Sequence, residues 1–135
     1  MDLLEQLQYA VTIALVGVIW TIQLVHYPAF KYISSSRFVD FERMHTLKIT
    51  LLVAPLMLME AITVCLLLYL SAFAMGNLLL ALIVALIWIA TFFVSVPCHR
   101  ILAQGKDERV IQRLITTNWI RTFLWSTKLV LLYFL

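Results

Sequence analysis

Charged and amide side chains lie inside long apolar stretches of this sequence, where a polar group needs a partner. Glu60 lies within PLMLMEAITVCLLLYL, and Arg121 lies within TTNWIRTFLWSTK. Because an isolated charge is costly in an apolar environment, we expect Glu60 and Arg121 to pair. Asn118 precedes Arg121 by three residues, which places both on one helical face. Together they could move a proton or stabilise negative charge on a substrate oxygen, so Glu60, Arg121 and Asn118 are the candidate catalytic residues.

Lys128 follows Arg121 by seven residues and falls on the same helical face. Its position near the end of the last apolar stretch predicts that it reaches the membrane surface, with its aliphatic stem in the apolar layer. A second role, as another partner of Glu60, remains open. A purely structural role for the Glu60–Arg121 pair, which would hold two helices together, also remains open.

Three histidines lie at the ends of apolar stretches, at positions expected to share one level of the membrane. His26 ends the first stretch, His45 precedes the second, and His99 ends the third. Three imidazoles at one level could bind a metal, and two could ligate a haem iron. His26, His45 and His99 are therefore the candidate cofactor-binding residues. No dense motif such as HExxH is present, so the metal or cofactor stays unknown, and ordinary solvated histidines are the alternative.

The elements that position these residues follow from composition. Of 135 residues, 64% are hydrophobic and 13% are charged, whereas a soluble domain is about half apolar and about a quarter charged. Spanning a bilayer takes about 20 mostly apolar residues in a helix. Four segments qualify, at about 9–27, 49–73, 77–96 and 114–135. We therefore expect one all-α domain over residues 1–135, an integral membrane four-helix bundle.

The segment between the first two expected spans is charged but has a helical pattern. Phe38, Phe41 and Met44 are three residues apart, which places them on one face. A serine run precedes them and predicts a helix beginning near Arg37. We expect this piece to lie at the membrane interface before the chain turns into the second span. Asp107 fits the start of the last helix.

Basic residues predict the orientation. They fall in the first and third connecting segments (Lys31, Arg37, Arg43, Lys48, Arg100, Lys106, Arg109 and Arg113). Because cytoplasmic loops carry the excess of lysine and arginine, both connections are expected in the cytoplasm and both termini outside. The net charge of +3 includes no basic tail, which argues against a nucleic-acid partner. The expected surroundings are a bilayer, with a homo-oligomer left open.

The last third of the chain carries a resemblance. The run VPCHRILAQGKDERVIQRLITTNWIRTFLWSTK is similar to small four-helix bacterial membrane proteins that distantly resemble the anthrone-oxygenase-like family. The matching residues are Pro97, His99, Arg100, Leu102, Trp119, Arg121 and Thr122. A histidine shortly before the Arg-Thr pair is usual in that family, whereas Trp119 and Ile120 stand here. The resemblance implies a four-helix fold in the inner (plasma) membrane of a bacterium and a lipophilic small-molecule substrate.

Three functions are compatible with these patterns. The first is a small membrane enzyme acting on an aromatic or isoprenoid lipophilic substrate, with Arg121 holding negative charge and Glu60 or a histidine moving a proton. The second is a haem- or metal-binding redox protein that uses the histidines. The third is a non-catalytic membrane scaffold or partner subunit. The first is the working hypothesis, and the substrate stays open.

Overall fold

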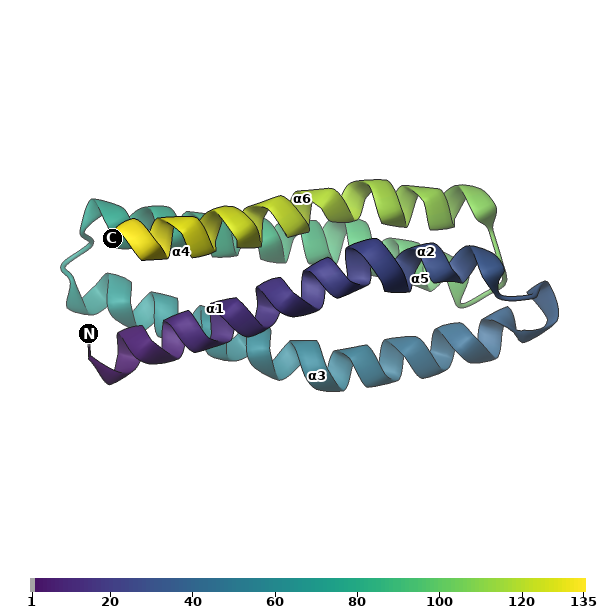
Figure 1. Cartoon of the computed structure of the whole chain (residues 1–135), viewed down its shortest axis with the longest axis horizontal. Coiled ribbons are helices and arrows are strands. Elements are labelled where there is room, and N and C mark those ends of the chain that lie inside the picture. Colours follow the sequence, from purple (N-terminus) through teal and green to yellow (C-terminus); the bar gives the residue numbers. More distant parts are fainter. Residues whose placement is uncertain (1) are drawn as a thin grey trace.

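The computed structural model describes residues 2–135, and within that range the chain is helical with no strand (Figure 1). The elements in chain order are α1 (Leu3–Thr21), the π-helical segment η1 (Ile22–His26), α2 (Tyr27–Ala29), the 3-10 segment η2 (Phe30–Tyr32), α3 (Ser35–Leu70), α4 (Met75–Ala90), the π-helical segment η3 (Thr91–Ser95), α5 (Val96–Leu102) and α6 (Glu108–Phe134). They form four rods. The first runs from α1 to η2, the second is α3, the third runs from α4 to α5, and the fourth is α6.

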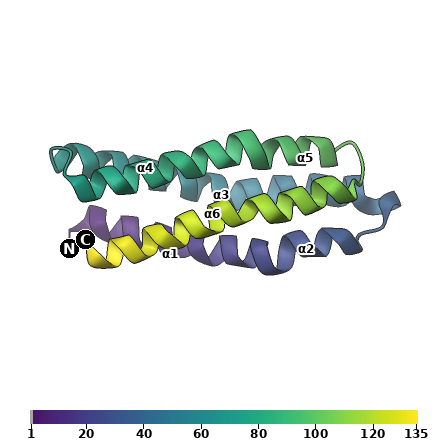
Figure 2. The ribbon, with the colours of Figure 1, turned by 90° about the horizontal axis from the view of Figure 1, so that it is seen from above.

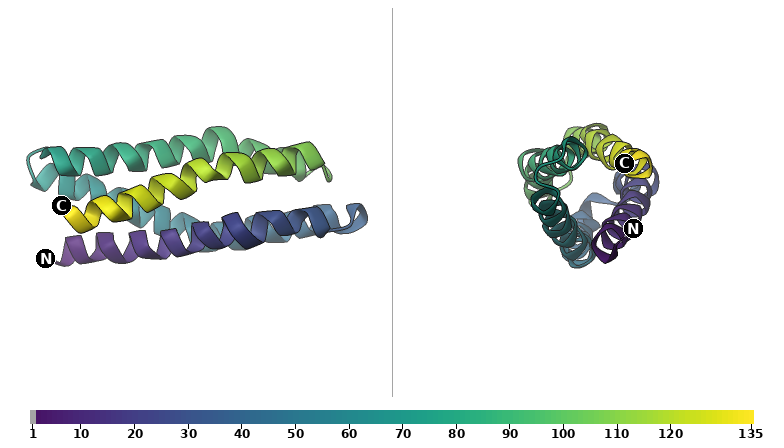
Figure 3. Two further views of the ribbon diagram at one scale, coloured as in Figure 1. Left: turned by 45° about the horizontal axis from the view of Figure 1, so that its top comes forward. Right: turned by 90° about the vertical axis from the view of Figure 1, so that its left-hand side faces the viewer.

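The rods lie side by side. Helix α1 packs against α3 and α6, and α4 packs against the same two helices. Figure 2 shows the N- and C-termini together at one end of the molecule, where the turn between α3 and α4 also lies. The connections before α3 and before α6 lie at the other end. The end-on view of Figure 3 shows the first and fourth rods as neighbours.

Three rods are long and apolar enough to cross a membrane: Leu3–Tyr32, Ser35–Leu70 and Met75–Leu102. They contain the expected spans at 9–27 and 77–96 and most of the span at 49–73, which was predicted to end three residues beyond Leu70. The fourth rod is less apolar because arginines and a lysine interrupt it. The expected all-α, membrane-type fold is therefore confirmed for its first three spans.

The expected helical extension before the second span is present, but no turn separates it from that span. Helix α3 runs unbroken for 36 residues, about 54 Å at 1.5 Å per residue, so the chain does not turn between the charged and apolar parts. Phe38 is fully buried, in edge-to-face contact with Phe30, and belongs to the protein interior. The helix begins at Ser35, and Ser34 makes no side-chain capping bond. Asp107, in contrast, caps α6 through the backbone N–H groups of Arg109 and Val110, as expected.

A π-helical segment interrupts both the first and the third rod at the same offset from a proline. Segment η1 ends two residues before Pro28, and η3 ends two residues before Pro97. Proline has no N–H to donate, and its ring clashes with the carbonyl four residues earlier, so a wider turn relieves the crowding. Single π turns are frequent at functional sites, and both of these border the cavity described below.

Candidate functional site: a closed ion pair and an open cavity

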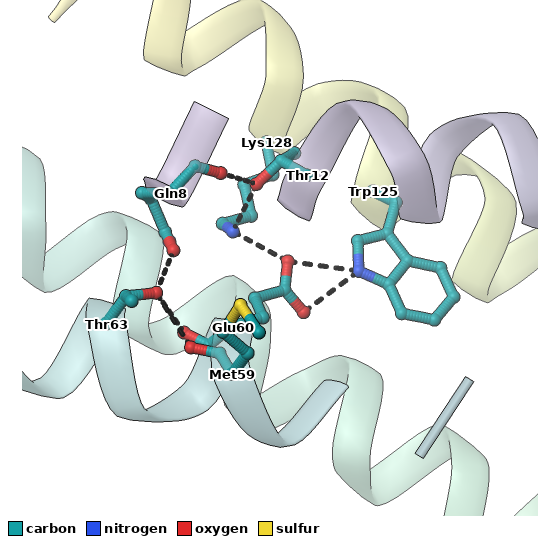
Figure 4. A network of polar contacts seen from close by, with 7 residues as sticks. All are labelled: Gln8, Thr12, Met59, Glu60, Thr63, Trp125 and Lys128. Carbon is teal, nitrogen blue, oxygen red and sulfur yellow. Dashed lines mark hydrogen bonds and ion pairs between the residues drawn. The ribbon is translucent and has the colours of Figure 1, made fainter. Parts of the chain in front are cut away.

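Glu60 pairs with Lys128, and both side chains are fully buried (Figure 4). The Lys128 Nζ donates to Glu60 Oε1 at 2.6 Å and to the Thr12 hydroxyl at 2.8 Å. The expected pairing of Glu60 with Arg121 is therefore wrong, and so is the expected reach of Lys128 to the membrane surface. Lys128 lies two helical turns beyond Arg121, and this offset along α6 brings it, not Arg121, to the carboxylate.

Further hydrogen bonds complete this centre. The indole N–H of Trp125 donates to both Glu60 oxygens, at 3.1 and 3.2 Å. The Thr63 hydroxyl donates to Gln8 Oε1 at 2.5 Å, which links α3 to α1 beside the pair (Figure 4). We name Glu60, Lys128, Trp125, Thr12, Thr63 and Gln8 the closed centre. Every charged atom in it has a partner, as a stable buried ion pair requires.

Arg121 is 5% exposed, and no carboxylate in residues 2–135 pairs with it. Its Nη1 donates a long hydrogen bond of 3.4 Å to Asn118 Oδ1. Its guanidinium lies 5.2 Å from the ring centre of Trp125 and beside the hydroxyl of Tyr27. Its Nε has no hydrogen-bond partner. A buried cation of this kind retains unused capacity to bind an acceptor.

Asn118 is buried and belongs to a structural amide cluster. Its Nδ2 donates to Gln23 Oε1 at 2.9 Å, and the Thr122 hydroxyl donates to the same oxygen at 3.1 Å. The Gln23 amide donates in turn to the backbone carbonyl of Ile115. These bonds join the first rod to α6. Asn118 thus lies beside Arg121, as expected from the sequence, but Glu60 belongs to the closed centre instead.

A cavity of about 210 Å³ lies beside Arg121. Its walls come from all four rods, and most of them are apolar. The lining residues are Ile22, Tyr27, Ile49, Thr50, Val53, Ala54, Met57, Trp88, Thr91, Phe92, Ser95, Val96, His99 and Arg121. A mostly apolar hollow with a few converging polar groups is the usual form of a small-molecule site.

Two residues that line this cavity each have a buried N–H donor without an acceptor. These donors are the Nε of Arg121 and the indole Nε1 of Trp88. Buried N–H groups are nearly always hydrogen-bonded, and leaving one unpaired costs about 1–3 kcal/mol. A ligand that presents an oxygen acceptor to these donors would relieve that cost.

His99 and Tyr27 also line the cavity, and Glu42 is hydrogen-bonded to the ring nitrogen of His99 that does not contact Tyr27. His99 Nδ1 lies 2.5 Å from Glu42 Oε1, and His99 Nε2 lies 3.2 Å from the Tyr27 hydroxyl. In the neutral tautomer whose Nδ1–H donates to Glu42, Nε2 is the acceptor and the Tyr27 hydroxyl donates to it. A carboxylate that fixes the imidazole in this way prepares Nε2 to act as a base. We name Arg121, Trp88, Tyr27, His99 and Glu42 the open centre.

The three candidate histidines meet, but their rings contact one another directly. His26 Nε2 lies 2.5 Å from His45 Nδ1, and the His45 and His99 ring centres are 5.4 Å apart. Phe30 and Phe41 pack against the His45 ring. Rings in contact leave no room for a planar macrocycle between them. Within residues 2–135, no group of three His, Cys, Asp or Glu side chains could hold a metal ion.

A larger hollow of about 510 Å³ lies at the end of the molecule that carries the termini. Glu5, Gln8 and Asn77 are among its lining residues, together with Leu135 at the C-terminus. The Gln8 Nε2 is unpartnered, but no cation and no histidine lines this hollow. Glu5 could exchange a proton there, but no cation of residues 2–135 stands beside it to hold negative charge on a substrate oxygen, so the smaller cavity is the better candidate site.

The sequence reasoning missed Glu42, Tyr27 and Trp88 as members of a site. Glu42 lies three residues before His45 and four after Phe38, so it shares their helical face, and that spacing could have revealed a buried carboxylate. Tyr27 adjoins His26 and has no distinguishing spacing. Trp88 lies inside an apolar span, where packing is the ordinary role of a tryptophan, and only the structure shows that its N–H lacks an acceptor.

Comparison with known protein families, with curated proteins and with solved structures found no match to this chain.

Proposed function

We propose that the four rods form one membrane-embedded bundle, with both termini on the outer side and the other end in the cytoplasm. The end remote from the termini carries the basic residues of the two connections, which are Lys31, Arg37, Arg43, Lys106, Arg109 and Arg113. Residues 2–8 and the turn at residues 71–74 contain none. The positive-inside rule favours this orientation. Helix α6, whose charges at Arg121 and Lys128 face inward, is the fourth span.

Within this bundle the protein acts as a small membrane enzyme that transfers a proton to or from a lipophilic substrate with an ionisable oxygen. The observation that carries this proposal is that two lining residues of one cavity, Arg121 and Trp88, each have a buried N–H without an acceptor, and that His99 lines the same cavity. The donors suit an oxygen that gains negative charge. His99, oriented by Glu42, is the group that exchanges the proton.

The geometry gives each residue a separate task. The substrate oxygen lies against Arg121 and Trp88, and the apolar walls hold the rest of the bound part and exclude water. His99 Nε2 takes the proton, either directly or through the Tyr27 hydroxyl to which it is hydrogen-bonded at 3.2 Å. The imidazolium that forms is stabilised by the Glu42 carboxylate at Nδ1. The reverse transfer returns the proton and resets the site.

The test is a comparison of lipid extracts from cells that express the wild type, His99→Gln or Arg121→Met, by untargeted mass spectrometry. The proposal predicts a lipophilic species whose amount changes when the wild type is expressed but not when His99→Gln or Arg121→Met is expressed. The matched control is Thr117→Val, on an α6 side chain outside both centres. A scaffold would give the same extract in all four strains, and that result would contradict the proposal.

A further inference from the structure

The cavity of the open centre has an open side. Most of its lining residues are buried or half-buried, but Thr50 and Ala54 on α3 and Phe92 on η3 are exposed. These three residues occupy the edge between the second and third rods. We name them the window. Arg121 and Tyr27, which are buried, lie at the inner wall.

The window faces the apolar layer rather than water. Thr50 and Ala54 belong to the apolar part of Ser35–Leu70, and Phe92 belongs to Met75–Leu102, which are two of the rods that can cross a membrane. Exposed neighbours such as Leu51, Leu58 and Phe93 continue the apolar surface on both sides. A molecule that reaches the cavity through this side therefore comes from the hydrocarbon of the bilayer.

The size of the cavity limits what can enter it. Sites that enclose a drug-sized ligand have volumes of about 300–1,000 Å³, whereas this cavity has about 210 Å³. Only part of such a molecule fits inside, and the part that suits Arg121 and Trp88 is a small group with an oxygen acceptor. The remainder has to extend through the window into the lipid.

We infer that the open centre takes the head of a bilayer-dissolved amphiphile, a long-chain molecule with a small anionic or ionisable oxygen group, which enters sideways between α3 and η3. This inference rests on the proposed function and specifies its substrate class. The small side chains of Thr50 and Ala54 leave space for the chain, and the buried guanidinium of Arg121, which pairs with no carboxylate of residues 2–135, anchors the head.

A photoreactive fatty acid tests this inference. The purified full-length chain in phosphatidylcholine vesicles is irradiated with a long-chain fatty acid that has a diazirine beside its carboxylate, and labelled residues are mapped by mass spectrometry. We expect labelling of the cavity wall near Met57 and Trp88. An excess of the same fatty acid without the diazirine should reduce this labelling, whereas an alkylamine of equal length should not. Absence of cavity labelling in the wild type would overturn the inference.

Four variants test access through the window and anchoring by Arg121 separately. Ala54→Trp and Thr50→Phe each obstruct the window and should reduce cavity labelling at least about tenfold, whereas Ala85→Trp, on an exposed face of α4, should leave it unchanged. Arg121→Met should reduce labelling by about ten- to a hundredfold, the loss expected for a hydrogen bond to a charged group. Labelling that survives both window variants would overturn sideways access. Labelling that survives Arg121→Met would overturn the anchor.

His99→Gln distinguishes this inference from the proposed function. His99 exchanges the proton but does not anchor the head, so this variant should keep the labelling. If it keeps the labelling and its lipid extract also matches the wild type, binding holds and the enzymatic proposal fails. If labelling disappears only with Arg121→Met and the window variants, the amphiphile assignment stands independently of catalysis.

Discussion

The closed and open centres both include buried charges on α3 and α6, but they differ in whether the cation on α6 has a carboxylate partner. In the closed centre, Glu60 accepts from Lys128 and Trp125, and Lys128 also donates to Thr12. In the open centre, Arg121 and Trp88 keep N–H groups without acceptors beside an empty volume of about 210 Å³. Trp125 touches both, because its N–H meets Glu60 while its ring lies under Arg121.

This difference separates a structural role from a functional one. A satisfied ion pair across α3 and α6 fixes the relative position of two helices and has little left to offer a ligand. An unpaired donor in an apolar wall destabilises the empty protein and gains its partner only when a ligand binds. The charges that look equivalent in the sequence, Lys128 and Arg121, thus have opposite tasks. Substitutions at Lys128, Glu42, Arg121 and Thr63 test this contrast.

The largest effect is expected for Lys128→Met. Removing the cation leaves Glu60 buried with the Trp125 N–H as its remaining side-chain partner, and breaking a buried pair costs about 3–5 kcal/mol. The free energy of unfolding, measured by titrating the detergent-solubilised protein with a denaturing detergent, should fall by that amount. The double variant Glu60→Leu with Lys128→Met should recover most of it. A single variant as stable as the wild type would show that the closed centre is not structural.

A smaller effect on stability is expected for Glu42→Leu. It leaves the His99 Nδ1–H without its acceptor, and an unsatisfied buried donor costs about 1–3 kcal/mol. Glu42→Gln retains an acceptor oxygen and should lose less. Both should abolish the lipid change produced by the wild type, since the histidine is no longer held by a carboxylate. Full activity in Glu42→Gln would contradict the role assigned to the charge.

Arg121→Met should have little effect on stability but a large effect on fatty-acid labelling, whereas the main effect of Lys128→Met is on stability. Because Arg121 has no carboxylate to leave behind, the free energy of unfolding should stay within about 1 kcal/mol of the wild type or increase. Fatty-acid labelling of the cavity should nevertheless fall. The same unfolding titration measures the free energy of unfolding. A loss of several kcal/mol would place Arg121 among the structural charges.

The smallest effect is expected for Thr63→Val, which removes the hydroxyl that donates to Gln8 while keeping the shape of the side chain. The loss should be about 0.5–1.5 kcal/mol, the net value of one neutral hydrogen bond. Labelling of the cavity should be unchanged, because Thr63 does not line it. An effect on labelling would mean that the two centres are coupled through Trp125.

The helices were predictable because apolar length and capping residues determine them locally. The expected spans at 9–27 and 77–96 lie within single rods, and Asp107 caps α6 as its position predicted. The continuity of α3 was not predictable, because the charged turns before Ile49 pack Phe38 and Glu42 into the interior. Local composition predicted the helix there, whereas its packing against Phe30 of the first rod depends on tertiary contact.

The candidate site was predictable only in part. Spacing placed Asn118, Arg121 and Lys128 on one face of α6, and all three are buried. It could not determine which of the two cations reaches Glu60, because that depends on how far α6 is shifted along α3. Nor could it show that Glu42 stands behind His99, since 57 residues separate them in the chain. Helix rotation and shift are set by packing.

Native mass spectrometry of the protein released from its own membrane tests the central contrast most directly. The wild type should carry one lipophilic molecule, which the double variant Glu60→Leu with Lys128→Met retains and Arg121→Met loses. That result would assign binding to the open centre and architecture to the closed one. A bound molecule that survives Arg121→Met but is lost from the double variant would reverse the assignment and contradict this account.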